Sequence, residues 1–286
     1  MVAETPDVLP EALAAVLALL RCPHCGRPLA PDGRAVRCAS GHAFDVARQG
    51  YLSLLAGGRA PAGDTAAMVA ARERVLGGGL FDPLSAAVAG AAAGGAGGAL
   101  VEVGAGTAHH LARALDRAPQ GRGIALDVSR PALRRAARAH PRAAAVGADV
   151  WGPLPLRDGV AGAALCVFAP RNGPELHRVL APGGVLVVAT PEPQHLAELR
   201  AALGLLDVDP RKEERLSRRL GDAFARRASE RVAWSMRLDR DAQVSLAAMG
   251  PSAFHADAAE LERRAAALPA ELEVTGAVTV AVYERR

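Results

Sequence analysis

The sequence predicts an α/β fold, a mostly parallel sheet with helices on both faces, preceded by a small metal-binding module. Three observations lead to this prediction. Short apolar segments alternate with helical ones from residue 99 to residue 189, which is the pattern of strand–helix–strand units. A glycine-rich turn, Gly104-Ala105-Gly106, closes the first of these strands. Three cysteines and a histidine between residues 22 and 42 have the spacing of metal ligands.

The first unit is expected to span residues 1–55. Its apolar stretch from Ala12 to Leu20 predicts a short helix that leans on the metal-binding module. The stretch is too short to cross a bilayer. Glu4 and Asp7 precede it, where a secretory signal would carry basic residues, so a signal peptide is not expected. No membrane partner is therefore expected.

Residues 56–80 are expected to form a linker and a helix. The composition of residues 56–63, rich in Gly, Ala and Pro, predicts a loop. Asp64 and Thr65 can then cap a helix, which the run of glycines at 77–79 ends.

The third unit, residues 81–286, contains the regular α/β pattern. A helix over about 83–93 precedes a glycine-rich stretch at 94–98. The expected strands then cover 99–103, 123–127, 143–146, 161–168 and 184–189. The expected helices cover 108–117, 130–139, 172–180, 193–204 and the charge-rich segment 207–231. The tail, 272–283, predicts one or two strands that close the sheet.

Four residues near the start have the spacing of a closed zinc site: Cys22, Cys25, Cys38 and His42. The first two thiolates, two residues apart, can both reach one tetrahedral ion, and Gly26 allows the tight turn beneath it. Because protein groups fill all four positions, none is left for water, and the Zn²⁺ is expected to be structural. His24, inside the first turn, is a weaker candidate for the fourth ligand.

The glycine-rich turn predicts a nucleotide-type cofactor. Gly104 and Gly106 let the backbone approach a ligand closely. An NAD site would have a third glycine three residues after Gly106, and that position is His109. The dinucleotide fingerprint therefore fails.

Two acids at the ends of the following strands indicate which cofactor is bound. Asp127 is placed to hold both ribose hydroxyls, and Asp149 is placed to bind the adenine amino group, which an NAD site does not require. The alternative for Asp149 is an ordinary carboxylate at a strand end. As a set, the residues favour S-adenosylmethionine (SAM): Glu102, Gly104, Gly106, Thr107, Asp127 and Asp149.

Composition sets wide limits. Half of the 286 residues are apolar, which is enough for a large core. The net charge of +4 permits a polyanionic partner without demanding one. Three of the four cysteines lie in the zinc motif, and the fourth, Cys166, lies in an apolar run. No disulfide framework is left, so a cytoplasmic location is expected.

Several further segments carry a resemblance to a known family. They are His42-Ala43-Phe44-Asp45, Gly63-Asp64-Thr65-Ala66-Ala67-Met68, Leu126-Asp127-Val128-Ser129, Phe168-Ala169-Pro170, Pro182-Gly183-Gly184 and Thr190-Pro191-Glu192-Pro193-Gln194-His195-Leu196. With the Cys/His motif, they resemble the bacterial 23S rRNA (guanine-N1)-methyltransferase family over nearly the whole chain. The Ala- and Arg-rich composition is similar to that of actinomycete members that protect macrolide producers against tylosin.

The resemblance implies a SAM-dependent methyltransferase domain with a Rossmann-like sheet and a zinc module that recognises RNA. It implies methyl transfer to N1 of a guanine in a 23S rRNA hairpin loop (the guanine-748 type), and resistance to tylosin-like macrolides. It also implies that Phe81 and His195 contact SAM. Phe81 stands where a tyrosine can occur, so a hydroxyl contact is lost, and Ala108 and His109 replace a commoner Gly-Tyr pair. Without the resemblance, His195 would be interpreted as a helix-capping residue.

Other interpretations stay open. A small-molecule methyltransferase would leave the zinc module without a purpose, and the intact turn with both acids argues against a non-catalytic SAM-sensing RNA-binding protein. No motif identifies the base that removes the guanine N1 proton; an acid or histidine near residues 168–171 is a candidate. Arginines that could contact phosphates or simply form solvated helix faces are Arg134, Arg135, Arg138, Arg211, Arg215, Arg218, Arg219, Arg226 and Arg227. A homodimer is left open.

Overall fold

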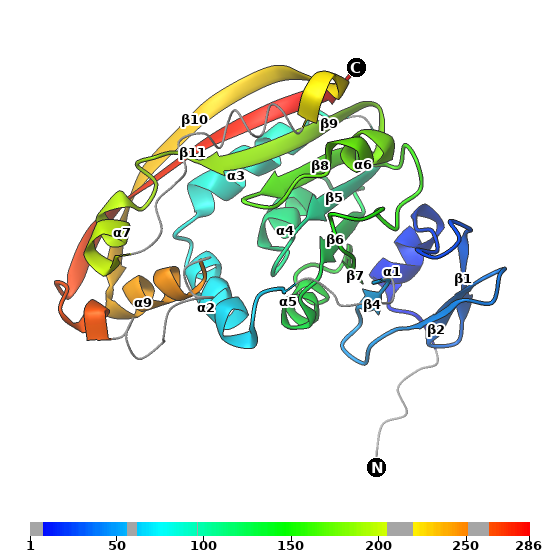
Figure 1. The fold of residues 1–286 in the computed structure, drawn as a ribbon, viewed down its shortest axis with the longest axis horizontal. Helices are drawn as coiled ribbons and strands as arrows, with labels where there is room; N and C mark the ends of the chain where they lie inside the picture. Colours follow the sequence, from blue (N-terminus) through cyan, green and yellow to red (C-terminus); the bar gives the residue numbers. More distant parts are fainter. Residues whose placement is uncertain (1–7, 56–61, 96, 205–219, 251–262) are drawn as a thin grey trace, which may run out of the picture.

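Within the described part of the chain, eight strands form one sheet in the order β10-β11-β9-β8-β5-β6-β7-β4 (Figure 1). The computed structural model describes residues 8–55, 62–95, 97–204, 220–250 and 263–286. The strands are β4 (Leu52–Ser53), β5 (Ala99–Val103), β6 (Gly123–Asp127), β7 (Ala143–Gly147), β8 (Ala161–Val167), β9 (Leu180–Pro191), β10 (Phe224–Asp239) and β11 (Glu271–Arg285). Neighbours from β9 to β4 are parallel, whereas β11 and β10 are antiparallel. This is the Rossmann-like sheet that the sequence predicts.

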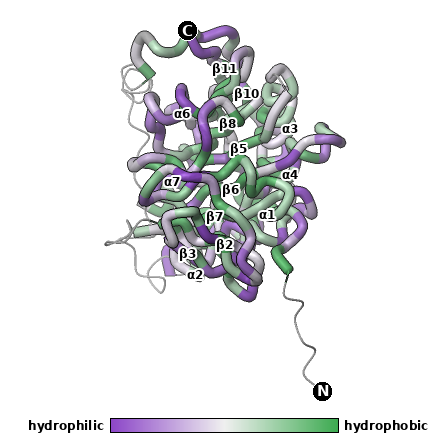
Figure 2. The backbone as a smooth tube through the Cα atoms, turned by 90° about the vertical axis from the view of Figure 1, so that its right-hand side faces the viewer, coloured by the Kyte–Doolittle hydropathy of each residue, from purple (hydrophilic) through white to green (hydrophobic). Residues whose placement is uncertain are grey.

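Helices cover both faces of the sheet. They are α1 (Glu11–Val16), α2 (Ala66–Gly77), α3 (Asp82–Ala92), α4 (His109–Asp116), α5 (Arg130–Ala136), α6 (Gly173–Val179), α7 (Ala197–Leu203) and α9 (Arg240–Ala248), with short 3-10 turns η1 (Leu17–Leu19) and η2 (Gly221–Ala223). Side chains alternate between the faces: Leu100 belongs to the buried cluster that contains residues of α2, α3, α4, α5, α7 and α9, whereas Val101 and Val103 belong to the cluster that contains residues of α1 and α6. The middle strands are apolar on both faces (Figure 2), as expected for a sheet that is covered on both sides.

The N-terminal residues form a separate small sheet and also join the large one. Strands β1 (Leu29–Asp32), β2 (Ala35–Cys38) and β3 (Ala43–Asp45) pair antiparallel. Strand β4 pairs with β7 of the large sheet, and α1 packs in the same buried cluster as β5 and β6. The predicted division into residues 1–55, 56–80 and 81–286 stays a prediction, but the first unit shares a core with the rest.

The predicted helix over residues 207–231 is wrong where the structure describes it. Residues 224–231 belong to β10, and residues 207–219 lie outside the described residues. Strand β10 is the edge of the sheet, and its residues 226–231 are exposed. Charged side chains are common on edge strands. Since residues 226–231 are exposed, this part of β10 lacks the apolar alternation that marks a strand. Helix α9, which follows, was not predicted.

The tail is one continuous strand, β11. It pairs with β10 from end to end, but only its second half pairs with β9. The first half and its β10 partner therefore extend beyond the sheet toward α7 and α9 (Figure 1). Trp234 packs on the face of Gly276, where a Cβ would lie 2.2 Å from the indole ring, and its Nε1 donates to the carbonyl of Leu80 at 2.8 Å. This contact ties the extension to the start of α3.

Among the described residues, no single helix has the length and apolar character needed to cross a membrane. Helices α2 and α3 meet those criteria only as a pair, and they are bent by 85° relative to each other.

Candidate metal and cofactor sites

The structure brings the four predicted zinc ligands together. Their sulfur and nitrogen atoms all lie within 4.8 Å of one another. The Cys25 and Cys38 sulfurs are 3.6 Å apart, and His42 Nδ1 lies 3.4 Å from the Cys38 sulfur. A tetrahedral ion with Zn–S bonds of about 2.3 Å places its sulfur ligands roughly 3.8 Å apart. The sulfur–sulfur separation and the number and type of the ligands therefore fit a tetrahedral zinc site.

Two backbone turns hold the ligands in place. The Gly26 amide donates to the carbonyl of Cys22 at 2.9 Å, and the Gly41 amide donates to that of Cys38 at 2.9 Å. Both glycines have positive φ, 71° and 85°. A hydrogen bond from the Arg27 backbone lowers the pKa of Cys25 to about 6, which favours the thiolate that a metal needs. The ring of the weaker candidate, His24, stacks on Phe44 with centroids 5.8 Å apart and is not part of the ligand group.

The predicted cofactor turn lies at the point where the strand order reverses. Strand β5 has β6 on one side and β8 on the other, and Gly104 to Gly106 follow its carboxyl end. Ligands of open α/β sheets bind at this place. Gly104 has φ of 65° and packs against Ala169, where a Cβ would lie only 2.8 Å from the Ala169 Cβ. Gly106 has φ of 55°, and Thr107 behind it is buried. Only glycine fits the first of these positions without strain.

Asp127, the last residue of β6, supports the glycine-rich turn at the carboxyl end of the sheet, which is called the cofactor edge below. One of its oxygens accepts the Gly106 amide at 2.8 Å, and the other accepts the Ser129 amide at 2.8 Å. Burial raises its pKa, and these two backbone hydrogen bonds counteract the rise. An ionised carboxylate has about four lone-pair positions, so two remain for ligand hydroxyls.

Asp149 lies on the neighbouring strand end. The Ala148 amide donates to the Asp127 carbonyl at 3.0 Å, so the two predicted acids follow adjacent strands at the same edge. Asp149 Oδ1 accepts the Trp151 amide at 2.9 Å. One carboxylate oxygen thus fixes the local turn, and the contact of Asp149 with adenine stays a prediction.

Glu102 links the strand before the turn to the helix after it. Its side chain is buried and accepts the Leu111 amide of α4 at 3.0 Å. Burial raises its pKa to about 8. The carboxyl group therefore anchors α4 to β5, and its predicted contact with SAM stays a prediction.

The buried Glu102 predicts a pH-dependent stability. Its proton is held up to about pH 8 in the folded chain but lost near pH 4.5 in the unfolded chain. The free energy of unfolding should therefore fall as pH rises between these values, by up to about 1.4 kcal/mol per unit. Glu102→Gln keeps the acceptor for Leu111 without ionising, so its penalty relative to the wild type should shrink from pH 6 to pH 8 in urea unfolding with zinc present. Parallel curves for the two proteins would contradict this origin of the pH dependence.

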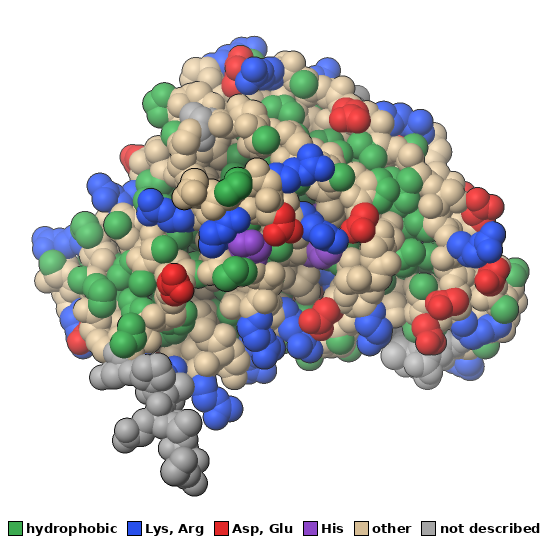
Figure 3. All heavy atoms as spheres, turned by 180° about the vertical axis from the view of Figure 1, so that it is seen from behind, with side chains coloured by type: hydrophobic (Ala, Val, Ile, Leu, Met, Phe, Trp, Pro, Cys, Tyr) green, Lys and Arg blue, Asp and Glu red, His purple; other side chains and the backbone are tan. Residues whose placement is uncertain are grey.

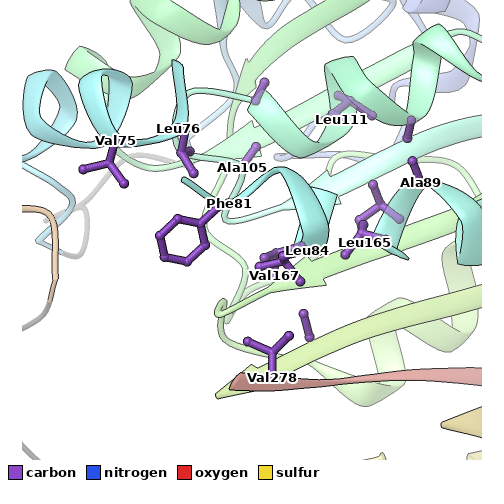
Figure 4. Packing of buried hydrophobic residues seen from close by; sticks show 14 of the residues in the cluster. Val75, Leu76, Phe81, Leu84, Ala89, Ala105, Leu111, Leu165, Val167 and Val278 are labelled. Atoms are coloured by element: carbon purple, nitrogen blue, oxygen red, sulfur yellow. The ribbon is translucent and has the colours of Figure 1, made fainter. Parts of the chain in front are cut away.

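Phe81 and His195 lie together in an aromatic cluster. Their ring centroids are 6.0 Å apart, and the cluster also includes Phe168, 5.5 Å from His195, and Trp234, 5.6 Å from Phe81. Figure 4 shows Phe81 beside Leu84 and Val167, with Ala105 of the glycine-rich turn nearby. Trp234 was not predicted as a member of this cluster, because the start of β10 was expected to be helical and the register of β10 with β11 does not follow from the sequence.

His195 does not cap the helix that follows it. Its Nδ1 accepts the amide of Ala277 in β11 at 3.2 Å. In the neutral ring this leaves the proton on Nε2, so that nitrogen is a hydrogen-bond donor. Leu196, next to it, and Phe168 both have positive φ, 56° and 54°. Such strain in non-glycine residues is concentrated at functional sites.

A polar network from the predicted linker also reaches the turn. The Asp64 carbonyl accepts Ser129 Oγ at 2.7 Å, and its carboxylate accepts Arg72 Nη2 at 2.7 Å. Thr65 caps α2, as predicted, by accepting the Met68 amide. The signal for this network was the Gly-Asp-Thr segment, which the sequence analysis used for the resemblance and for the helix start but not for the cofactor site.

Comparisons with known proteins give one consistent group. A family model described as RlmA, N-terminal, a zinc ribbon, matches residues 20–57. A 23S rRNA (guanine(748)-N(1))-methyltransferase of Streptomyces fradiae is 52% identical over 93% of this chain and 97% of its own length. A Micromonospora griseorubida protein described as a putative 23S rRNA (guanine-N(1)-)-methyltransferase is 48% identical over 97% of this chain and 98% of its own length. A Bacillus subtilis protein with the same description is 30% identical over 65% of this chain and 68% of its own length.

Proposed function

The chain belongs to the 23S rRNA (guanine-N1)-methyltransferase family, and we propose that it transfers a methyl group from SAM to N1 of a guanine in a hairpin loop of 23S rRNA. The observation that carries this proposal is the 52% identity over 93% of the chain to a relative named for guanine 748. Both elements that such an enzyme needs, a zinc ribbon and a cofactor turn, lie in this one chain.

The residues at the cofactor edge fit SAM. The paired glycines give a close backbone approach, and Asp127 keeps lone pairs for two ribose hydroxyls. The further contacts that we propose are those of Phe81, Glu102, Thr107, Asp149 and His195. When bound, SAM supplies a methyl group on a positively charged sulfur, ready for in-line displacement. The protein's main task is then to hold the guanine in line with that group.

Guanine N1 carries a proton at neutral pH, which must leave before or during attack. With Nδ1 accepting the Ala277 amide, the neutral ring of His195 carries its proton on Nε2 and has no second basic nitrogen for the guanine proton. Glu102 is occupied by the Leu111 amide. The base is therefore not assigned to either of them.

The RNA-facing surface is proposed to combine the zinc module with α5. The turn that ends the module touches α5, since a Cβ on Gly50 would lie 3.9 Å from the Cβ of Ala137. Exposed arginines lie on both sides of this junction: Arg48 on the module, Arg134 on α5, and Arg138 in the turn that follows α5. Arg135 is instead paired with Glu73 at 3.3 Å.

The other predicted arginines do not lie at this junction. Arg226 and Arg227 lie on the exposed edge strand β10, and Arg211, Arg215, Arg218 and Arg219 lie outside the described residues. Basic and acidic groups are mixed over the face in Figure 3, so that face as a whole is not a basic patch. Arginines that lie together at the junction of the module and α5 can bind neighbouring phosphates of a folded hairpin loop.

Methylation of protein-free 23S rRNA is the direct test. With labelled SAM, the full chain is expected to label 23S rRNA, and nucleoside digestion should give 1-methylguanine. Because N1 lies on the pairing edge, reverse transcriptase should stop one nucleotide before a single hairpin position. Arg134→Gln with Arg138→Gln should raise the KM for RNA several-fold and flatten its salt dependence, whereas Arg227→Gln on the far edge strand should not.

A different product would overturn the proposal. Label confined to a small metabolite would favour a small-molecule methyltransferase, and SAM binding without transfer would favour a SAM-sensing RNA-binding protein. Methylation at the guanine-748 type of position is proposed to obstruct tylosin-like macrolides, so expression in a sensitive host should raise tolerance to them. The cytoplasmic location and the absence of a membrane partner belong to this proposal, and a homodimer stays a prediction.

A further inference from the structure

The side chain of Arg72 crosses the glycine-rich turn. Arg72 comes from α2, far from the turn in sequence, yet a Cβ on Gly106 would lie 3.3 Å from its Cδ and 3.5 Å from its Nε. The guanidinium group thus lies in the space that the missing side chain of Gly106 leaves. It is next to the backbone amide that Asp127 holds.

One end of this guanidinium group is fixed. Its Nη2 donates to the Asp64 carboxylate at 2.7 Å and to the carbonyl of Met249, at the end of α9, at 3.0 Å. Asp64 is itself tied to Ser129, which follows Asp127. The position of the arginine is therefore set by groups from three separate parts of the chain.

The Nε atom of the Arg72 guanidinium group has no hydrogen-bond partner among the described residues. Arg72 Nε is also buried. An unsatisfied donor on a cation is costly to bury, so this nitrogen is poised for an acceptor that enters from outside the chain. The nearby carboxylates of Glu102 and Asp127 do not supply it, since Arg72 Nε makes no hydrogen bond to either of them.

We infer that Arg72 binds the carboxylate of the methionine part of SAM. This inference rests on the proposed function, and it assigns to one residue the recognition of the amino-acid end of the cofactor. SAM carries a single anionic group, and the ribose is expected at Asp127, one hydrogen bond away from the turn that Arg72 covers. A charge-assisted hydrogen bond from Nε to a carboxylate oxygen satisfies the buried donor.

An RNA phosphate is the other anion that could meet this arginine. The burial of Nε favours the cofactor, because a phosphate in an RNA backbone brings two nucleosides with it. The Arg72 side chain as a whole is only 26% exposed. The cofactor is small enough to reach a donor at the base of the turn.

The test compares SAM with 5′-methylthioadenosine, which has the same nucleoside but no amino-acid part. Isothermal titration of the full zinc-loaded chain is carried out with both ligands on the wild type and on Arg72→Gln. The expected result is a roughly ten- to hundred-fold weaker affinity for SAM in the variant, with less than a three-fold change for methylthioadenosine. Because the second ligand still needs the glycine turn and Asp127, it reports whether that part of the site remains folded.

Arg74→Gln is the matched control. Arg74 lies two residues after Arg72 in α2, and its Nε donates to Ser245 Oγ of α9 at 3.1 Å. Its substitution therefore weakens the contact between α2 and α9 without removing the group that lies over Gly106. It should leave the affinities for both ligands within three-fold. Equal losses for SAM and methylthioadenosine in Arg72→Gln, or no loss for either, would overturn the inference. So would an unchanged SAM affinity with a raised KM for RNA, which would assign Arg72 to the RNA. A wild type that binds neither ligand would instead overturn the proposed function, and this inference with it.

Discussion

Loss of the zinc ion is expected to unfold the N-terminal module and to abolish methylation of RNA. Structural zinc contributes an apparent 10–16 kcal/mol in small zinc-binding domains. The sheet β1–β3 contributes only Leu29 and Val36 as buried aliphatic side chains to the core that it shares with α1 and β4, so the metal is its main support. Cys38→Ser should release the metal, expose residues 22–45 to hydrogen exchange while β4 stays paired with β7, and reduce methyl transfer to RNA by at least a hundred-fold. Metal content, exchange and transfer are measured on the same preparation.

The histidine next to the site supplies the control. His24 lies inside the first cysteine turn but stacks on Phe44 outside the ligand group, so His24→Ala should keep one zinc per chain. SAM affinity should change less than three-fold in Cys38→Ser, because the glycine turn is supported by Glu102 and Asp127 rather than by the module. Equal loss of zinc in both variants, or loss of SAM affinity as large as the loss of RNA methylation, would contradict this division of roles.

Sequence and structure agree most closely where the chemistry is local. The zinc ligands follow from spacing alone, since two short turns bring Cys22 near Cys25 and Cys38 near His42. Strands β5 and β6 have the predicted bounds, because a buried parallel strand is a short apolar run closed by turn residues. Cys166, which lies in the apolar run of β8, is buried.

The remainder depends on contacts between distant segments. The first part of the edge strand β10, residues 226–231, carries no apolar alternation because it is exposed on both faces, so its charged sequence resembles a helix. Asp64 was predicted to cap a helix and Arg72 lies within that helix, but no local pattern indicates that the helix packs across the glycine turn. Trp234 reaches Phe81 only because Gly276, in the paired strand, leaves room for the indole ring. Each of these needs the register of a strand pair or the packing of a helix, which a single sequence does not specify.

Gly104→Ala is expected to destabilise the chain and to abolish SAM binding. Gly104 has φ of 65°, and a Cβ there would lie 2.8 Å from the Cβ of Ala169. The left-handed backbone costs an alanine about 1–2 kcal/mol, and overpacking costs about 1–3 kcal/mol more. The free energy of unfolding should therefore fall by roughly 2–5 kcal/mol. SAM affinity should fall beyond detection by titration, since the turn must move away from the cofactor edge to relieve the contact.

A second substitution separates the two causes. Ala169→Gly removes the atom that the new Cβ meets but does not alter φ at residue 104. The double variant should thus recover the part of the stability loss that is due to the contact, about 1–3 kcal/mol, and retain the backbone part. The coupling energy from the four proteins measures the contact directly. Additive losses would mean that the turn and the Phe168-Ala169-Pro170 segment are not packed together as the structure has them. Full recovery would mean that the left-handed backbone at residue 104 carries no cost.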